Sequence, residues 1–350
     1  MDERQRGFLD ELLTTASPSG FETPATRVWV DYVSAFADDV SVDAYGNAVA
    51  TVEGSGDADV AFGGHADEIG FIVRAIDDDG FLSLSRIGGS DRTVMRGQHV
   101  TVHTDDPVHG VVGQTAIHLR DGDDDPADIE KQSVDVGATS REEAEELVEV
   151  GDPVTFSSGV QDLQGDRIAA RGMDNRVGIW AAAEGLRRAG ERGAEATVHA
   201  VATVQEEVGL EGARMVGFDL DPDAFVAVDV THATDAPGAP GDAVSPVGLG
   251  DGPVVARGST NHSGLVTGVR EAADDEDIDV QLQAAGSSTG TDADAVFTAR
   301  GATPSLNVGL PNRYMHTPVE VVDTADLDAT ADLLAAVGRR IETFDLGPGF

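Results

Sequence analysis

The spacing of hydrophobic positions predicts two helices and two strands in the first part of the chain. Residues 4–22 place Phe8, Leu9, Leu12 and Leu13 on one face of a helix, which the Ser-Pro-Ser-Gly segment after Ala16 ends. A second helix is expected to begin near Thr23, with proline in its first turn. Residues 43–54 read as a strand that follows a turn. Residues 59–73 read as a buried strand whose C-terminal end carries His65.

The pattern of hydrophobic and polar positions changes between about residue 74 and residue 165. Short β-like runs, FLSLSRIGG, HVTVHT, GVVGQTAI and DPVTFSSGV, are separated by turns and by one short helix that opens at Ser140. The acidic run RDGDDDPADIEKQS reads as a loop, and it lacks the glycine and glutamate spacing of a calcium-binding loop. This section therefore predicts a small β-rich module.

Strands then alternate with helices to the end of the sequence. The strands are expected within 196–209, 224–235, 279–285 and 303–311. The strand within 224–235 is expected to end at Asp229, and the strand within 279–285 is expected to lead into a Gly/Ser loop. Helices are expected over 173–191 and 325–344. Such alternation predicts an α/β fold, with a mixed, mostly parallel sheet between helices. We expect a main domain of residues 1–73 and 166–350, and an inserted β-rich domain of residues 74–165.

The amino-acid composition limits the kinds of binding partner and the cellular location that we expect. The chain contains 64 acidic and 23 basic residues. Its net charge of −41 argues against binding to nucleic acid or to an anionic membrane. An acidic surface of this kind suits a very salty cytoplasm. The absence of cysteine excludes disulfides, thiolate zinc sites and a cysteine nucleophile. We find neither a signal peptide nor an apolar run of transmembrane length, so a cytoplasmic protein is expected.

Several polar residues follow the predicted buried strands, where a sheet of this type binds its ligands. They are His65, Asp67, Asp174, Glu206, Glu207, Asp229 and His316. Clustered carboxylates would repel one another and raise their pKa values, a conflict that divalent cations remove. Imidazole and carboxylate ligands without sulfur suit zinc, cobalt or manganese. A metal bound to His65 would leave its other ring nitrogen for Asp67 to orient.

Six segments in order resemble the M42 family of dinuclear metallo-aminopeptidases, which includes the tetrahedral TET peptidases, glutamyl aminopeptidases and proteins labelled endoglucanases. The segments are GGHADEIGFIV, RGMDNRVG, QEEVGLEGA, AVDVTHATD, GTDADAV and NRYMHTPVE, and SPSGFE, GGSDRTVMRGQHVTV and DVGATSREEAEELVEVGDPVTF match as well. The resemblance implies a zinc-peptidase-like catalytic domain that releases N-terminal residues from short peptides. It also implies that the insert mediates dimerisation and that dimers form a hollow dodecamer.

The resemblance assigns roles to individual residues. One metal would be held by His65, Asp174 and Asp229, and the other by Asp174, Glu207 and His316, so that Asp174 bridges two ions (Zn²⁺, Co²⁺ or Mn²⁺). A hydroxide between the metals would be the nucleophile. Glu206 would be the general base and Asp67 would orient His65. Arg313, Ser287, Ser288 and Thr289 are candidates for the pocket that selects the N-terminal residue.

Other interpretations stay open from the residues alone. Asp174 suits a helix cap, and Glu206 with Glu207 suits a solvated strand end. M28 or M20 peptidases and amidases use similar ligand sets. The endoglucanase label points instead to glycoside hydrolysis, which ordinarily uses two carboxylates without metals. A chaperone-like or scaffold protein with a vestigial site is the remaining alternative, which a peptide turnover assay would test.

Overall fold

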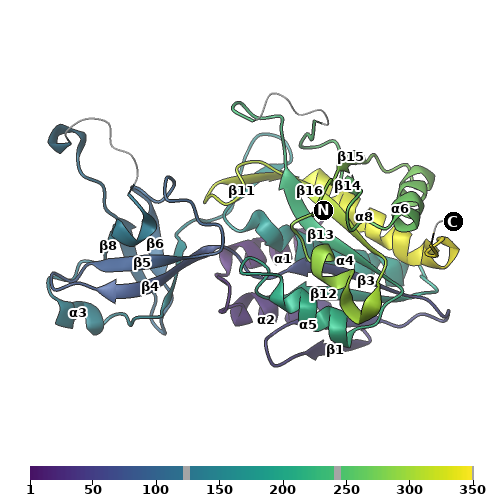
Figure 1. Ribbon diagram of the computed structural model, residues 1–350, viewed down its shortest axis with the longest axis horizontal. Helices are drawn as coiled ribbons and strands as arrows, with labels where there is room; N and C mark the ends of the chain where they lie inside the picture. The colour runs from purple at the N-terminus through teal and green to yellow at the C-terminus, as the bar shows by residue number, and fades with distance from the viewer. Residues whose placement is uncertain (121–126, 240–245, 349–350) are drawn as a thin grey trace.

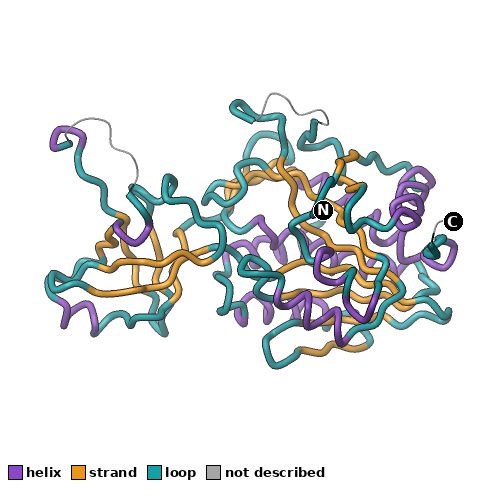
Figure 2. The backbone as a smooth tube through the Cα atoms, in the orientation of Figure 1, coloured by secondary structure: helices purple, strands orange, loops and turns teal. Residues whose placement is uncertain are grey.

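The computed structural model describes residues 1–120, 127–239 and 246–348, which form a larger α/β body and a smaller β-barrel (Figure 1). The barrel lies at one end of the molecule's longest axis, and both chain ends lie on the larger body. Strands run through the middle of the larger body, with helices around them (Figure 2). The predicted fold class, a mixed and mostly parallel sheet between helices with an inserted β-rich domain, is confirmed.

The main sheet contains eight strands within the described residues, in the order β1-β2-β12-β3-β13-β16-β14-β15. Its centre is parallel: β12 and β13 flank β3, and β16 continues the parallel set beside β13. The pairs β2–β12 and β14–β16 are antiparallel. The strands are β1 (Asp39–Val42), β2 (Ala48–Val52), β3 (Asp59–His65), β12 (Thr197–Thr203), β13 (Ala224–His232), β14 (Val254–Arg257), β15 (Gln281–Ala284) and β16 (Ser305–Asn312).

Helices cover both faces of this sheet. The larger hydrophobic cluster packs α1, α2, α4, α6 and α8 against one face, whereas a smaller cluster packs α5 and α7 against the other. Neighbouring residues of β3 separate accordingly, since Phe62 joins the first cluster and Ala61 the second. The helices are α1 (Glu3–Thr14), α2 (Thr23–Val33), α4 (Met173–Glu191), α5 (Glu211–Asp219), α6 (Ser263–Asp275), α7 (Ala293–Val296) and α8 (Thr324–Arg340).

The first two helices form as the sequence predicts. Asp2 caps α1, because its side chain accepts from the backbone N–H of Gln5 while the Gln5 side chain accepts from the backbone N–H of Asp2. The apolar face of α1 is buried, and its four predicted members, Phe8, Leu9, Leu12 and Leu13, are at most 4% exposed. Helix α2 begins at Thr23 with proline in its first turn.

The inserted barrel closes in the order β4-β5-β8-β7-β6-β9 and has a hydrophobic core of its own. Its elements are β4 (Gly70–Ile76), β5 (Leu82–Ile87), β6 (His99–Val102), β7 (Val108–Val112), η1 (Ile117–Leu119), η2 (Ile129–Lys131), β8 (Ser133–Asp135), α3 (Arg141–Glu145) and β9 (Pro153–Phe156). Helix α3 follows Ser140, as predicted. The acidic loop predicted over 120–133 lies partly outside the described residues. The predicted limits of the insert, 74 and 165, stay a prediction.

A small third sheet, β10-β11-β17, joins the segment after the barrel to the C-terminal part of the larger body. Its strands are β10 (Gln161–Asp162), β11 (Arg167–Ala170) and β17 (Glu320–Asp323), and the short helices η3 (Ala299–Gly301) and η4 (Ile341–Thr343) complete the described elements. None of the helices in the described ranges has the length and apolar character needed to cross a membrane.

Two predicted strands differ from the structure. The strand predicted within 59–73 ends at His65, as expected, but the apolar residues beyond it form a separate strand, because the chain leaves the main sheet after His65 and enters the barrel at Gly70. The turn between them binds the N-terminal segment, because the backbone N–H of Glu68 donates to the backbone oxygen of Ser17 and the backbone oxygen of Glu68 accepts from the N–H of Ser19. Strand β13 does not end at Asp229 but runs to His232, because β16 continues to pair with it beyond the end of β3.

Candidate metal centre

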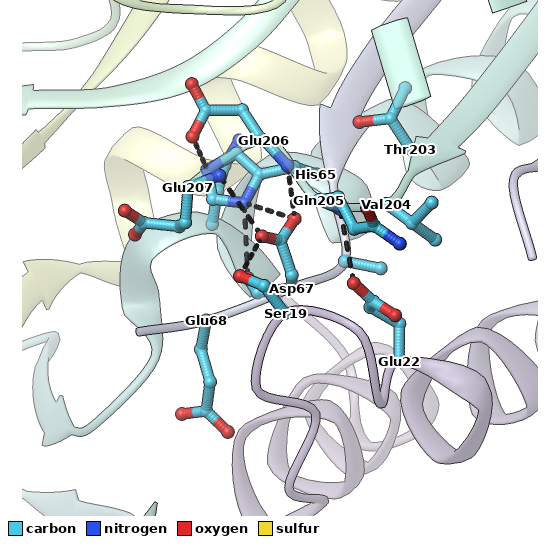
Figure 3. Close-up of polar contacts among 12 residues, drawn as sticks. Ser19, Glu22, His65, Asp67, Glu68, Thr203, Val204, Gln205, Glu206 and Glu207 are labelled. Atoms are coloured by element: carbon cyan, nitrogen blue, oxygen red, sulfur yellow. Dashed lines mark hydrogen bonds and ion pairs between the residues drawn. The ribbon is translucent and has the colours of Figure 1, made fainter. Parts of the chain in front are cut away.

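The seven predicted site residues come together at the carboxyl edge of the parallel strands. His65 ends β3, Asp229 lies in β13, and Asp174 lies in the first turn of α4. The acid pair Glu206 and Glu207 follows β12, close to His65 (Figure 3). The segment after β16 carries His316 to the same place. The common edge follows from the register, since Thr203 at the end of β12 is paired with His65 at the end of β3.

Three carboxylates surround the Nε2 atom of His65, which is 1% exposed. Asp174 Oδ1 is 3.1 Å away, and Glu206 Oε2 and Asp229 Oδ1 are each 3.7 Å away. His65, Glu206 and Asp229 form one group whose ligand atoms are close enough to share an ion. The geometry therefore places Glu206 among possible ligands, whereas the sequence assigned it the role of base; that role stays a prediction.

A second group comprises Asp174, Glu207 and His316. Here Nε2 of His316 lies 3.3 Å from Asp174 Oδ2 and 3.4 Å from Glu207 Oε1. The carboxylate of Asp174 thus turns one oxygen toward each imidazole, which is the position of a bridging ligand. Oε1 of Glu207 is buried and has no hydrogen-bond partner among the described residues.

The separations between these atoms fit a shared metal ion. Ligands about 2.0–2.1 Å from a tetrahedral ion lie about 3.3 Å from one another. The nitrogen–oxygen separations here run from 3.1 to 3.7 Å and lie around that value. Most exceed the 2.7–3.2 Å that is usual for a nitrogen–oxygen hydrogen bond. The donors and their spacing therefore suit two divalent ions better than a network of direct hydrogen bonds.

Without a bound cation, the buried carboxylates of the two ligand groups repel one another. Burial, reinforced by neighbouring carboxylates, raises the pKa of Glu206 to about 10. Burial likewise raises the pKa values of Glu207 and Asp229 above their ordinary range. The nearby carboxylates of Asp174 and Glu207 raise the pKa of His316 to about 11. The cluster would take up protons unless metal ions supply the positive charge, which supports a metal site at this position.

Asp67 contacts residues of both ligand groups and is fully buried. Its Oδ1 is 3.4 Å from Nδ1 of His65, and its backbone oxygen is 3.1 Å from the same nitrogen. The carboxylate also accepts the backbone N–H groups of Glu206 at 3.0 Å and Glu207 at 3.1 Å, and the hydroxyl of Ser19 at 2.6 Å (Figure 3). Asp67 therefore fixes the acid pair as well as facing the imidazole, and the sequence had suggested only the second contact.

The first turn of α4 is fixed by residues that the sequence reasoning missed. Glu320 in β17 is buried, and its Oε2 accepts from the backbone N–H of Asp174 at 3.1 Å and from the Asn312 amide at 2.7 Å. The Asn175 amide donates to the backbone oxygen of Val228, next to Asp229, at 2.8 Å. The sequence offered a signal for Glu320, because it ends the NRYMHTPVE segment, but an acid in so acidic a chain looks solvent-exposed and was not singled out.

A further buried acid, Asp292, lies behind the site at 2% exposure. Its Oδ2 accepts the hydroxyl of Thr203, the last residue of β12, at 2.6 Å. Burial raises the pKa of Asp292 to about 6. The sequence offered a signal for it, because it lies within the GTDADAV segment.

Two of the four residues suggested for a substrate pocket, Arg313 and Thr289, are engaged with the protein. Arg313 forms two contacts of 2.7 Å with Asp235. Thr289 binds Asp294 through its backbone and its hydroxyl. Their role in selecting the N-terminal residue of a substrate stays a prediction.

Beside the site, Glu68 forms a buried ion-pair cluster with two arginines. Both carboxylate oxygens contact Arg171, and Oε1 lies 3.0 Å from Nη2 of Arg176 and from the backbone N–H of Ser17. Burial alone would raise the pKa of Glu68, but the two guanidinium groups lower it to about 2. Glu68 thereby connects the segment that carries His65 to α4.

We expect Glu68→Gln to lower the free energy of unfolding by about 3 kcal/mol at pH 7, because it leaves two buried guanidinium groups without their carboxylate. The folded pKa lies below the ordinary 4.5, so this stabilisation is complete above pH 4.5 and is lost as the pH falls toward 2. Urea unfolding should show the difference from wild type shrinking over that window. Asp162→Asn, which removes an exposed partner of Arg6, should change stability little; an equal loss in both variants would contradict the prediction.

The model of the M42 glutamyl aminopeptidase family matches residues 46–333. This chain belongs to the M42 family. It is therefore an aminopeptidase, and its two groups of ligand residues are candidate sites for the metal of an M42 metallopeptidase.

Individual members of the M42 family resemble the chain over nearly its whole length. A lysyl aminopeptidase of Pyrococcus furiosus is 35% identical, with 97% of this chain and 99% of the relative covered. A TET aminopeptidase of a thaumarchaeote from marine sediment is 32% identical with a TM-score of 0.91, covering 97% of this chain and 98% of the other. The TET1 peptidase of Pyrococcus horikoshii, which can assemble into a tetrahedron or a large octahedral shell, is 30% identical with a TM-score of 0.84 and coverages of 95% and 99%.

Proposed function

We propose that this M42 aminopeptidase holds two divalent metal ions and releases N-terminal residues from short peptides. The observation that carries the proposal is the position of Asp174, with one oxygen 3.1 Å from His65 and the other 3.3 Å from His316. One carboxylate placed between two imidazole-containing groups suits a pair of ions better than a single ion. His65, Asp174 and Asp229 would hold the first ion, and Asp174, Glu207 and His316 the second.

The bound ions would lower the pKa of water and polarise the scissile carbonyl. Glu206 is suited to receive the proton of the attacking water at Oε2, because that carboxylate is nearly buried and accepts no hydrogen bond from a described residue. The same oxygen would return the proton to the leaving amine. Asp67 would keep His65 in one orientation and hold the backbone of the acid pair in place.

The same residues argue against glycoside hydrolysis. A glycosidase ordinarily has two carboxylates that flank the substrate without metal ligands. Here the carboxylates of Asp174 and Glu207 face imidazole nitrogens at 3.3 and 3.4 Å, an arrangement that suits metal binding and amide hydrolysis.

Removal and return of metal tests the proposal. We expect a chelator to abolish hydrolysis of aminoacyl chromogenic substrates at high salt, and Co²⁺ or Zn²⁺ to restore it. N-acetylated versions of the same substrates should stay intact, because an aminopeptidase requires the free α-amine. Full activity in the chelator, or cleavage of soluble cellulose instead of peptides, would reject the proposed function.

We further propose that the inserted barrel mediates dimerisation and that dimers assemble into a hollow dodecamer. M42 relatives of this chain form TET shells. On the barrel, Ile117 and Leu119 are 72% and 79% exposed, and such apolar side chains gain from burial in an interface. Light scattering of the metal-loaded sample would show this assembly, and a monomer alone at high salt would reject it.

A further inference from the structure

Two glycines of the inserted barrel lie against the second group of candidate ligands. Gly88 and Gly89 directly follow β5 of the barrel, whereas Glu207 and His316 belong to the larger body. A methyl group built on Gly89 would lie 2.6 Å from both Cε1 and Nδ1 of His316. One built on Gly88 would lie 3.1 Å from Cβ and from Oε2 of Glu207. The backbone of the barrel thus closes one side of the site.

The imidazole of His316, whose side chain is 32% exposed, cannot move away from Gly89 without leaving the second group of ligands. Its Nε2 lies 3.3 Å from Asp174 and 3.4 Å from Glu207, so a ring displaced by a methyl group would leave that group. Its backbone has a φ of +62°, a left-handed conformation that few non-glycine residues adopt and that only supporting contacts maintain. A carbon–nitrogen contact of 2.6 Å is well inside van der Waals distance, so either the ring or the glycine backbone would have to shift.

The two candidate metal-binding histidines are oriented differently. Nδ1 of His65 faces two oxygens of Asp67. For Nδ1 of His316, the described residues provide no hydrogen-bond partner, and the ring packs on Gly89 instead. A metal-binding imidazole needs its ring fixed by a neighbour. At His316 the backbone of Gly89, which packs against the ring, would fix the ring orientation.

The glycine corner is itself held firmly. Ser90 is 6% exposed, and its hydroxyl lies 2.8 Å from the backbone oxygen of Gly70 and 3.1 Å from that of Ile87. Gly70 begins β4, which follows the segment that carries His65. Gly88 has a φ of +63°, which favours glycine. The corner is therefore tied to the first ligand segment and cannot retreat easily from His316.

We propose that the corner Gly88–Gly89 is a positioning element of the second metal site, and that Gly89 must lack a side chain so that His316 can reach the ion. The inserted barrel would then serve metal binding in every subunit, independently of any role in assembly. This inference rests on the proposed two-metal site.

The test is Co²⁺ binding to the full-length protein after removal of metal by a chelator, followed by calorimetry and by the visible absorption of cobalt. Wild type should bind two Co²⁺ ions. Gly89→Ala should bind one ion as wild type does and the second at least about tenfold more weakly. Gly113→Ala is the matched control, because it adds the same methyl group in the barrel with only Ser133 O nearby, at 3.8 Å; it should bind both ions normally.

A double variant separates a local effect from a general one. If Gly89 acts through His316, Gly89→Ala combined with His316→Ala should bind Co²⁺ no more weakly than His316→Ala alone. Metal-free Gly89→Ala should also unfold near the temperature of metal-free wild type. Unchanged affinity at both sites, an additive loss in the double variant or a strongly destabilised metal-free protein would each overturn the inference. Wild type that binds no second Co²⁺ would instead reject the proposed two-metal site.

Discussion

Asp174→Ala should yield a folded protein that retains neither metal ion and has lost aminopeptidase activity by more than about a thousandfold. The carboxylate lies between Nε2 of His65 and Nε2 of His316, so its removal takes one ligand from each group at once. The two imidazoles and the remaining acids would then face each other without the ion that relieves their conflict. Loss of a Lewis acid gives up several kcal/mol of transition-state stabilisation, and about 4 kcal/mol corresponds to a thousandfold in rate.

Elemental analysis of the purified variant checks the metal content, and chromogenic substrates check the rate. Asp326→Ala is a suitable control, because Asp326 is also buried but accepts hydrogen bonds from the backbone N–H groups of Gly250 and Gly252. That variant should be less stable yet keep both ions. Two ions retained by Asp174→Ala would disprove the bridging role.

Glu206→Gln should keep both metal ions and reduce turnover by about a hundredfold to ten-thousandfold, the range typical of a lost general base. Glutamine has nearly the same shape as glutamate, but its amide cannot accept the proton of water. Its backbone N–H still donates to Asp67, so the loop that carries Glu207 should keep its position. The low residual activity should also lose the dependence on pH that ionisation of the base imposes.

The count of bound ions decides between the two roles open to Glu206. The carboxylate lies 3.7 Å from Nε2 of His65 and forms a group with that residue and Asp229, so it is placed to act as a ligand too. Loss of one ion in Glu206→Gln would assign it to the first metal, and near-normal turnover would place the base elsewhere. Glu211→Gln, which alters the partner of Arg214 on the following helix, should behave as wild type.

The sequence predicts the site well because parallel strands end at one edge of a sheet. The buried strands before Glu206 and His65 are apolar and end at the same level, so acids and imidazoles that follow them must meet. Helix α1 is equally predictable, since its cap and its apolar face are local features. In both cases the residues that decide the structure are neighbours along the chain or lie at equivalent points of a regular pattern.

Other features depend on partners far apart in the sequence. The sequence predicted that His65 ends a strand, but not that a barrel strand begins at Gly70, because the apolar run continues through the turn and no local pattern marks the change of partner. The extension of β13 beyond Asp229 depends on β16, some eighty residues later in the register. The contact of Gly89 with His316 crosses from one body to the other, so it becomes visible only when both are placed in space.

The position of the barrel along the chain has a consequence for how the enzyme matures. His65 precedes the whole barrel and Asp174 follows it, so the first metal-binding pair can meet only after that intervening stretch has been made and has brought its two ends together. Because closing so long a loop costs conformational entropy, we expect this contact to form late in folding. We therefore expect a nascent or refolding polypeptide to hold its imidazoles and acids apart, and hydrolytic activity to appear only when folding is complete.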